Sequence, residues 1–184
     1  MYNAKKILHK CEICNSKLFS QFQNYGKVGL TAEYGKISIR ICLNCSFIMI
    51  NPRYTKKFYV NYYKEKYGKK SLGNKEITKE YIRSQIKRGH KVYNFFHKFL
   101  KKKGSILDHG SGAGYTMVPW IKNGWKSIGI DPYKTAVNKS KELENLDVKQ
   151  AFGEKLPFKK DYFDLVISLG SLEHSYNLKL SMNE

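Results

Sequence analysis

The residues with the clearest capacity for chemistry lie in a short glycine-rich turn that an acid precedes. Glycine at every second position lets the backbone approach a ligand closely and adopt positive φ angles. The positions are Asp108, Gly110, Gly112 and Gly114. A second acid, Asp131, lies about 20 residues beyond the turn, where an acid can hold the ribose hydroxyls of an adenosine-containing cofactor. The spacing therefore predicts a nucleoside cofactor site.

The glycine spacing also indicates which cofactor suits the turn. A dinucleotide fingerprint needs a third glycine where Tyr115 stands here, so an NAD-dependent oxidoreductase is disfavoured. That fingerprint also directs a helix N-terminus at a pyrophosphate, which Asp108 would repel. The turn favours a ligand that has a cationic end and no phosphate.

At this point the chain resembles the class I S-adenosylmethionine (SAM)-dependent methyltransferases, whose first motif is an acid followed by G-x-G-x-G. Further motifs follow in the order that this family has. They are Gly129-Ile130-Asp131, Gly153 to Phe158, Tyr162 to Val166 and Leu172-Glu173-His174. The resemblance implies an α/β fold with a Rossmann-like methyltransferase sheet. An unrelated α/β domain with a glycine turn is the plain alternative.

The resemblance implies a role for each matched residue. Asp108 would meet the methionine end of SAM through its amino group, and the turn at Gly110 and Gly112 would bring backbone beside the methionine and ribose. Asp131 would accept hydrogen bonds from both ribose hydroxyls. An acid usually meets the adenine where this chain has Phe152, which would either stack on the ring or belong to the core.

A candidate base follows the last predicted strand. A hydroxyl or carbon acceptor must lose a proton, and histidine suits that task near neutral pH. In similar sugar C-methyltransferases a Glu-His pair has been proposed as the base, which points to His174 with Glu173 orienting it. A structural role for this pair carries equal weight. His109, inside the turn, is expected to pack behind the loop.

The four cysteines of the chain form two C-x-x-C pairs, Cys11 with Cys14 and Cys42 with Cys45. Each pair can place two thiolates on one side of a tight knuckle, and two knuckles complete a tetrahedral zinc site. Asn15 and Ser46 stand where such a knuckle often has glycine. We predict a four-cysteine zinc ribbon in which the metal stabilises the fold. A redox dithiol is the alternative.

The elements that must position these residues can be read from the apolar pattern. Strands are expected near 105–108, 126–130, 146–151 and 163–168, with an aromatic helix over 55–67 and an amphipathic helix over 76–103. The helix over 76–103 should bury Ile77, Tyr81, Ile82, Val92, Phe96, Phe99 and Leu100. The predicted domains are a ribbon (1–50), an aromatic helix with a Gly/Lys/Ser linker (51–74) and a methyltransferase core (75–184).

About four strands make an incomplete sheet for this family, so we expect a chain truncated at its C-terminus, with low activity, or a second chain that completes the sheet. An incomplete sheet would leave its last strand as an exposed edge. The order of ribbon, Asn51-Pro52, aromatic helix and core resembles bacterial zinc-ribbon methyltransferases, some of which act on sugar nucleotides or surface-polysaccharide precursors.

The net charge of +19 raises the question of a nucleic-acid partner, either for a zinc-ribbon binding module or for an RNA methyltransferase with a vestigial cofactor fold. Only four of the 34 basic residues are arginine, however, and arginine is favoured for bidentate phosphate and base recognition. A solvated, lysine-rich surface is the preferred interpretation. The sequence contains no run of apolar residues long enough to span a membrane and no signal peptide, which indicates a cytoplasmic protein.

Overall fold

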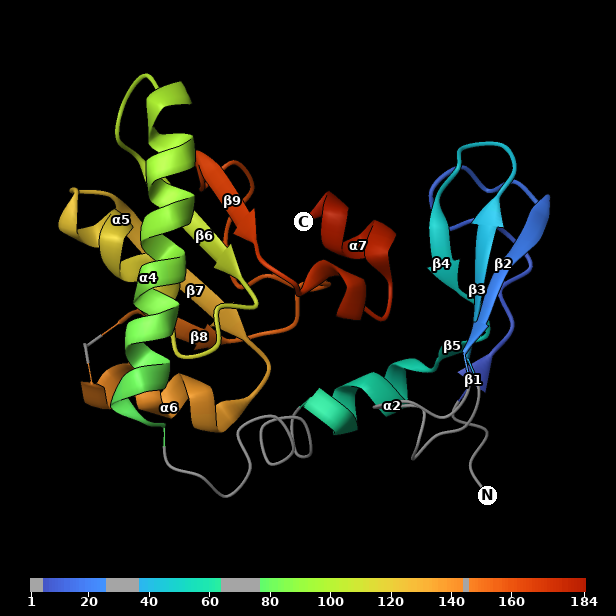
Figure 1. Cartoon of the computed structure of the whole chain (residues 1–184), viewed down its shortest axis with the longest axis horizontal. Helices are drawn as coiled ribbons and strands as arrows, with labels where there is room; N and C mark the ends of the chain where they lie inside the picture. Colours follow the sequence, from blue (N-terminus) through green and yellow to red (C-terminus); the bar gives the residue numbers. More distant parts are fainter. Residues whose placement is uncertain (1–4, 26–36, 64–76, 144–145) are drawn as a thin grey trace. The chain divides into compact units, whose positions relative to one another are not determined.

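The computed structural model describes residues 5–25, 37–63, 77–143 and 146–184 (Figure 1). The chain forms two compact units, one of residues 1–59 with 176–179 and one of residues 60–175 with 180–184. The division falls inside helix α2 (Lys56–Asn61). The linker predicted at 68–74 and the end of the predicted aromatic helix lie outside the described residues.

The first unit is built from short antiparallel strands. Strands β2 (Phe19–Tyr25), β3 (Ile37–Cys42) and β4 (Ile48–Ile50) form one sheet in the order β2-β3-β4, and β1 (Lys5–Lys6) pairs with β5 (Arg53–Tyr54). The register sets Phe19 opposite Cys42. Because β2 leaves the first cysteine pair and β3 enters the second, this register brings the two pairs together.

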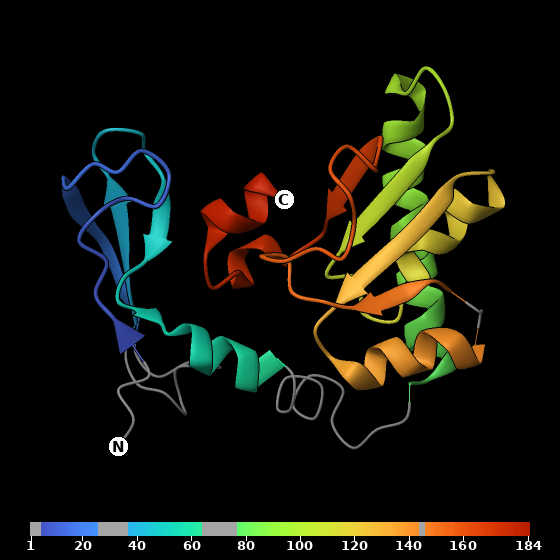
Figure 2. The ribbon, with the colours of Figure 1, turned by 180° about the vertical axis from the view of Figure 1, so that it is seen from behind.

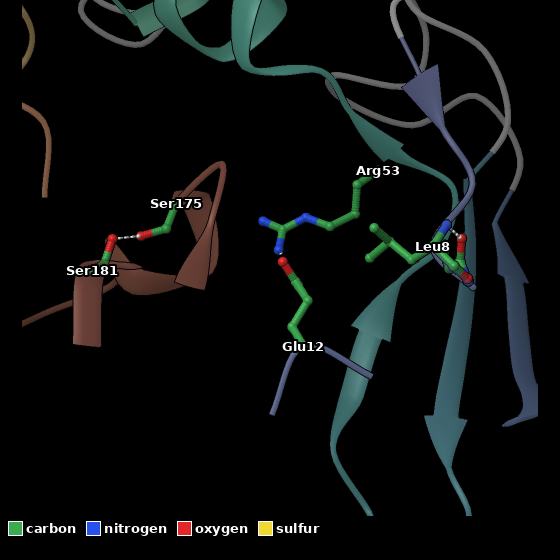
Figure 3. Close-up of polar contacts among 6 residues, drawn as sticks. Leu8, Glu12, Arg53, Ser175 and Ser181 are labelled. Atoms are coloured by element: carbon green, nitrogen blue, oxygen red, sulfur yellow. Dashed lines mark hydrogen bonds and ion pairs between the residues drawn. The ribbon is translucent and has the colours of Figure 1, made fainter. Parts of the chain in front are cut away.

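The segment after β4 is tied back to the first cysteine pair by polar side chains. The Asn51 amide accepts a hydrogen bond from the Leu8 N–H at 2.9 Å and donates to the Leu8 carbonyl at 2.8 Å. The buried Arg53 guanidinium forms an ion pair with Glu12, which lies between the two cysteines of that pair (Figure 3). Asn51 and Arg53 therefore fix the end of the ribbon from within the unit.

The second unit contains a parallel sheet in the order β8-β7-β6-β9. Its strands are β6 (Ser105–His109), β7 (Lys126–Asp131), β8 (Val148–Gln150) and β9 (Leu165–Ser168). The expected α/β fold is confirmed, and all four predicted strands form, each within two residues of the predicted bounds. Strand β9 pairs with β6 and ends the strand order, and its Val166 is 59% exposed.

Helices and 3-10 turns precede and follow these strands along the chain, and the last helix is divided between the two units. They are α4 (Lys79–Phe96), η2 (His97–Phe99), η3 (Tyr115–Met117), α5 (Val118–Lys122), α6 (Lys134–Leu143), η4 (Leu172–His174) and α7 (Leu178–Asn183). Helix α4 crosses one face of the sheet, in front of the strands in Figure 1 and behind them in Figure 2. Thr78 caps the helix by accepting a hydrogen bond from the Tyr81 N–H at 3.2 Å. No helix in the described part of the chain is long and apolar enough to cross a membrane.

The core beneath α4 differs from the expected apolar face at the end of the helix. Val92, Tyr93 and Leu100 pack against a cluster of Ile106, Trp120 and Trp125. The predicted core residues Phe96 and Phe99 are instead 44% and 66% exposed. The α-helical spacing used for the prediction does not continue past Phe96, because the chain becomes a 3-10 turn at His97.

Helix α4 also approaches the turn that follows β6. A Cβ at Gly89 would collide with the backbone carbonyl of Thr116, so glycine at this position allows the close contact. Ile82 and Ile86 of the same helix pack against a second cluster, which includes Ala113, Tyr115 and Met117. The helix thus supports the glycine turn directly.

Candidate functional site

The glycine turn between β6 and η3 is held by the end of β7. The N–H groups of Gly110 and Ser111 donate to the Ile130 carbonyl at 2.9 and 3.0 Å. The N–H of Gly112 donates to Asp131 Oδ2 at 2.9 Å. The second predicted acid therefore shapes the turn as well as lying beside it.

The three glycines of the turn all have positive φ angles, 75°, 58° and 84° for Gly110, Gly112 and Gly114. A Cβ at Gly110 would collide with Ser171, and one at Gly114 would lie 2.7 Å from Met117. At Gly112 a Cβ would meet no atom within 4 Å, and this residue lines a cavity. Packing against the protein thus explains two of the glycines, whereas Gly112 faces open space that a ligand can occupy.

Two cavities meet at this end of the sheet and share Gly110, Asp131 and Gly170. The larger, of about 350 Å³, contains charged and hydroxyl side chains, including Asp108, Arg88 and Thr116. We call it the charged cavity. The smaller, of about 90 Å³, is lined by apolar side chains, by two histidines and by polar residues that include the buried Glu154. We call it the apolar cavity, and its lining includes Ile130, Pro132, Phe152, His109 and His174.

Asp108 is buried in the wall of the charged cavity, with 4% of its surface exposed. Burial raises the pKa of its carboxyl to about 6, although a hydrogen bond from the Thr116 hydroxyl (2.5 Å) and the charge of Arg88 both lower it. A buried carboxylate is costly without a positive partner. The site is therefore suited to receive a cationic group of a ligand.

The sequence analysis missed Arg88, which lines the same cavity from helix α4. Its Nη2 donates to the Leu169 carbonyl at 3.1 Å. A guanidinium and a carboxylate in one cavity suit the carboxylate and ammonium of an amino acid. Tyr81, Gln85 and Arg88 follow one another at helical spacing and line the cavity together. The expectation that Tyr81 is buried on the apolar face of the helix is wrong, since Tyr81 is 39% exposed.

Asp131 lies where the two cavities meet. Its Oδ2 accepts the Gly112 N–H and its Oδ1 accepts the Tyr133 N–H at 2.8 Å. Burial raises the pKa of this carboxyl, and the two backbone hydrogen bonds oppose the rise. Each oxygen can accept a further hydrogen bond, so the carboxylate can still hold two ligand hydroxyls.

The apolar cavity brings together other predicted residues. Phe152 and His174 both line it, and the His174 ring lies 5.5 Å from the Tyr63 ring. Burial lowers the pKa of His174, while the charge of Glu173 raises it. Glu173 itself is exposed and is not among the residues that line the cavity.

The four cysteines form a separate cluster in the first unit, with all four sulfur atoms within 4.8 Å of one another. The Cys11–Cys45 and Cys14–Cys42 sulfur separations are 3.7 and 3.6 Å. Four sulfurs bound tetrahedrally at about 2.3 Å from zinc would be about 3.8 Å apart, so the cluster fits the metal.

The two cysteine knuckles have the same backbone geometry. Asn15 and Ser46 adopt positive φ angles of 60° and 59° at equivalent positions. Their N–H groups donate to the carbonyls of Cys11 and Cys42 at 3.0 and 2.9 Å. The left-handed conformation at these two residues explains why such a knuckle often has glycine there, and the cluster is a weak indication of zinc.

Comparisons with known proteins agree with this geometry. Residues 107–184 match a family described as a methyltransferase domain (Methyltransf_11). The chain is 29% identical over 85 residues to "Uncharacterized methyltransferase YcgJ" of Bacillus subtilis, an alignment that covers 43% of this chain and 34% of the relative. The crystal structure of YcgJ has 26% identity and a TM-score of 0.43, with 50% of this chain and 43% of that chain covered.

The plantazolicin methyltransferase BpumL in complex with SAH has a TM-score of 0.53 and 15% identity, with 68% of this chain and 50% of that chain covered. The chain thus spans about a third of its curated relative and half of this solved structure. The likeness to BpumL shows the fold. Residues 107–184 match the methyltransferase-domain family model, and the parallel sheet has the fold of this solved methyltransferase.

The buried carboxyl of Asp108 leads to a prediction about stability and pH. Its folded-state pKa of about 6 lies above the ordinary 3.8, so ionising it destabilises the folded state. The penalty grows as pH rises through this interval. Asp108→Asn should therefore raise the free energy of unfolding of the ligand-free protein, relative to wild type, by more at pH 7 than at pH 4. We expect the two effects to differ by on the order of 2 kcal/mol.

Urea unfolding followed by tryptophan fluorescence measures this, because both tryptophans of the chain lie in the second unit. Thr116→Val is the companion variant, since it removes a hydrogen bond to the ionised carboxylate and should steepen the loss of stability with pH. A difference between Asp108→Asn and wild type that stays constant from pH 4 to 7 would contradict the raised pKa.

Proposed function

We propose that this chain binds SAM across the ends of β6 and β7 and directs its methyl group to a small-molecule acceptor. The observation that carries the proposal is the open space at Gly112, in a cavity that the buried Asp108 and Asp131 also line. When bound, SAM supplies a methyl group that its positively charged sulfur activates. The protein must then hold both reactants in line.

The two cavities divide the cofactor according to its chemistry. In this proposal the charged cavity holds the amino-acid end, with its ammonium near Asp108 and its carboxylate near Arg88. Asp131 accepts the ribose hydroxyls at the junction. The apolar cavity receives the adenine between Pro132 and Phe152. A pyrophosphate would instead lie against the carboxyl of Asp108, which disfavours a dinucleotide.

Cofactor binding is the direct test. Calorimetry should detect binding of SAM and of its demethylated form SAH, and Asp131→Ala should weaken binding by on the order of 1–3 kcal/mol through the lost ribose hydrogen bonds. Asp161→Asn, an exposed substitution beyond the lining of both cavities, is the matched control and should bind as wild type does. Equal affinity of Asp131→Ala and wild type would remove this acid from the site. Preferential binding of NAD would overturn the proposal.

For the acceptor we propose a sugar nucleotide or surface-polysaccharide precursor. The support is the resemblance of the whole arrangement, with its ribbon, Asn51-Pro52 and core, to methyltransferases of that kind. Within this proposal His174 removes the acceptor's proton, because it lines the cavity and burial lowers its pKa, which leaves a neutral imidazole near pH 7. Glu173, which is exposed, orients His174 or adjusts its pKa through its charge.

A role as base predicts how His174→Gln behaves. With an acceptor from this class, the variant should lose on the order of 10²–10⁴-fold in kcat while SAH affinity stays within a factor of two or three. It should also lose the acidic limb of the pH–rate profile. Unchanged turnover in His174→Gln would assign this residue a structural role.

We further propose that the cysteine cluster holds one structural zinc ion. The four thiolates would leave the metal no open position, so its role would be to stabilise a unit whose small core consists largely of the cysteines and their neighbours. A redox role would require each cysteine pair to form and break a disulfide. The two matched knuckles instead group all four sulfurs in one cluster, which favours a metal.

Elemental analysis should find one zinc per chain. Cys42→Ser should lower zinc content and loosen the first unit, because it removes a ligand that is fully buried. The tryptophan unfolding transition of the second unit should change little. A zinc-free wild-type protein that keeps a protected ribbon, judged by amide hydrogen exchange, would refute the proposal.

A further inference from the structure

Three phenylalanine side chains are exposed at the end of helix α4 and in the 3-10 turn that follows it. Phe95, Phe96 and Phe99 are 56%, 44% and 66% exposed. A phenylalanine side chain has on the order of 200 Å² of surface, so the three together present roughly 300 Å² of apolar surface to solvent. An apolar patch of this size on a protein surface often marks a site of interaction.

The three rings contact one another as a compact cluster. The ring centroids of Phe95 and Phe96 are 4.8 Å apart with the planes at 79°, and those of Phe95 and Phe99 are 6.0 Å apart at 59°. The Lys98 ammonium lies over the Phe95 ring at 5.4 Å and over the Phe99 ring at 5.2 Å. The rings are therefore packed edge to face or covered by a cation, and they do not form a row of free flat faces.

Lysines accompany this cluster. Residues 91–103 contain five lysines and no acidic residue. Four of the five follow the first ring of the cluster and are exposed: Lys98, Lys101, Lys102 and Lys103. The charge of Lys102 reaches Asp164, but that carboxylate already accepts a hydrogen bond from the Ser105 N–H at 2.8 Å. We call the three phenylalanines and these four lysines the aromatic-lysine patch.

The aromatic-lysine patch lies at the end of the parallel sheet that is opposite to the candidate cofactor site. The 3-10 turn that contains Phe99 leads into the start of β6, and β7 begins beside β6 because the two strands are parallel. The glycine turn follows the other end of β6 (Figure 1). A partner that covers the patch would therefore leave the two cavities open.

We propose that the aromatic-lysine patch docks on the surface of an anionic lipid bilayer. The rings enter the boundary between headgroups and acyl chains, and the lysine ammonium groups contact the lipid phosphates. Stable attachment of this kind needs an apolar element and a basic element together, and the patch supplies both. The proposal is independent of the cofactor and of the methyl acceptor.

Two other occupants fit the patch less well. Single-stranded nucleic acid stacks its bases on free aromatic faces, but Lys98 lies over the faces of Phe95 and Phe99. A second copy of the chain would bring two lysine-rich segments together, and their charges would repel. An anionic bilayer complements both the charge of the lysines and the apolar rings.

Co-sedimentation with vesicles tests the contribution of the rings. At low salt, the wild-type chain should bind vesicles of phosphatidylcholine and phosphatidylglycerol in equal parts and leave phosphatidylcholine vesicles largely unbound. The double substitution Phe95→Ser, Phe99→Ser should weaken binding to the anionic vesicles by on the order of tenfold. Phe22→Ser replaces a phenylalanine of similar exposure (59%) in β2, so it is the matched control and should bind as wild type does.

A second comparison separates the patch from the charge of the whole chain, since a net charge of +19 attracts any anionic surface. Replacing Lys101, Lys102 and Lys103 by glutamine should weaken binding by on the order of 100-fold. Replacing Lys134, Lys141 and Lys149 by glutamine removes the same charge from exposed positions in α6 and β8. This control should weaken binding by no more than about threefold.

A fluorescent reporter locates the contact without removing the cluster. Phe99→Trp should be quenched by bromine-labelled lipids in the anionic vesicles more strongly than wild type, whose tryptophans are buried. Phe22→Trp should gain no such quenching. This measurement decides the matter if the double substitution does not fold.

Several results would overturn the proposal. One is equal vesicle binding by wild type and the double phenylalanine variant, and another is equal weakening by the two lysine triples. Phe99→Trp without added quenching would do the same. So would a wild-type chain that binds single-stranded RNA but no anionic vesicles, or one that forms a dimer which Phe95→Ser, Phe99→Ser dissociates.

Discussion

The hydrogen bonds between the end of β7 and the glycine turn after β6 are the constraint on which the site depends. Three successive N–H groups, those of Gly110, Ser111 and Gly112, are held by the Ile130 carbonyl and the Asp131 carboxylate. They fix the turn in left-handed conformations that only glycine adopts at low cost. They also commit Asp131 to one orientation, at the junction of the two cavities.

From this constraint follows the division of the site into a charged and an apolar half. The cavity with Asp108 and Arg88 meets the cavity with Phe152 and His174 at Gly110, Asp131 and Gly170, while Gly112 leaves open space in the charged cavity. The charged half costs stability in the absence of ligand, since a carboxyl with a pKa of about 6 is buried there. Binding of a cationic ligand group beside this carboxyl would therefore stabilise the folded protein.

Much of this arrangement could be predicted from the sequence, because it depends on local patterns. Strand ends follow from short apolar runs, and the knuckle conformation at Asn15 and Ser46 follows from the spacing of their cysteines. The face that a long helix buries was less predictable. Phe96 and Phe99 continue an apolar pattern, but the helix ends at the first of them, and Tyr93 contacts Trp120 instead.

Other features depend on residues far apart in the chain. The hydrogen bonds of the His109 ring depend on Ser168 and Ser171, about sixty positions later, which only the β6–β9 pairing brings close. Arg88 acquires its place beside Asp108 because Gly89 lets α4 approach the turn. No pattern within either segment encodes these contacts, so they become visible only in the folded structure.

The central claim is that the turn held by β7 is a cofactor site. Backbone amide NMR of the labelled full-length chain, recorded with increasing SAH, tests it most directly. The account predicts saturable shifts at Gly110, Ser111, Gly112 and Asp131, with the amides of Cys11 and Cys42 unmoved. Absence of shifts at saturating SAH, or shifts confined to residues away from the two cavities, would contradict it.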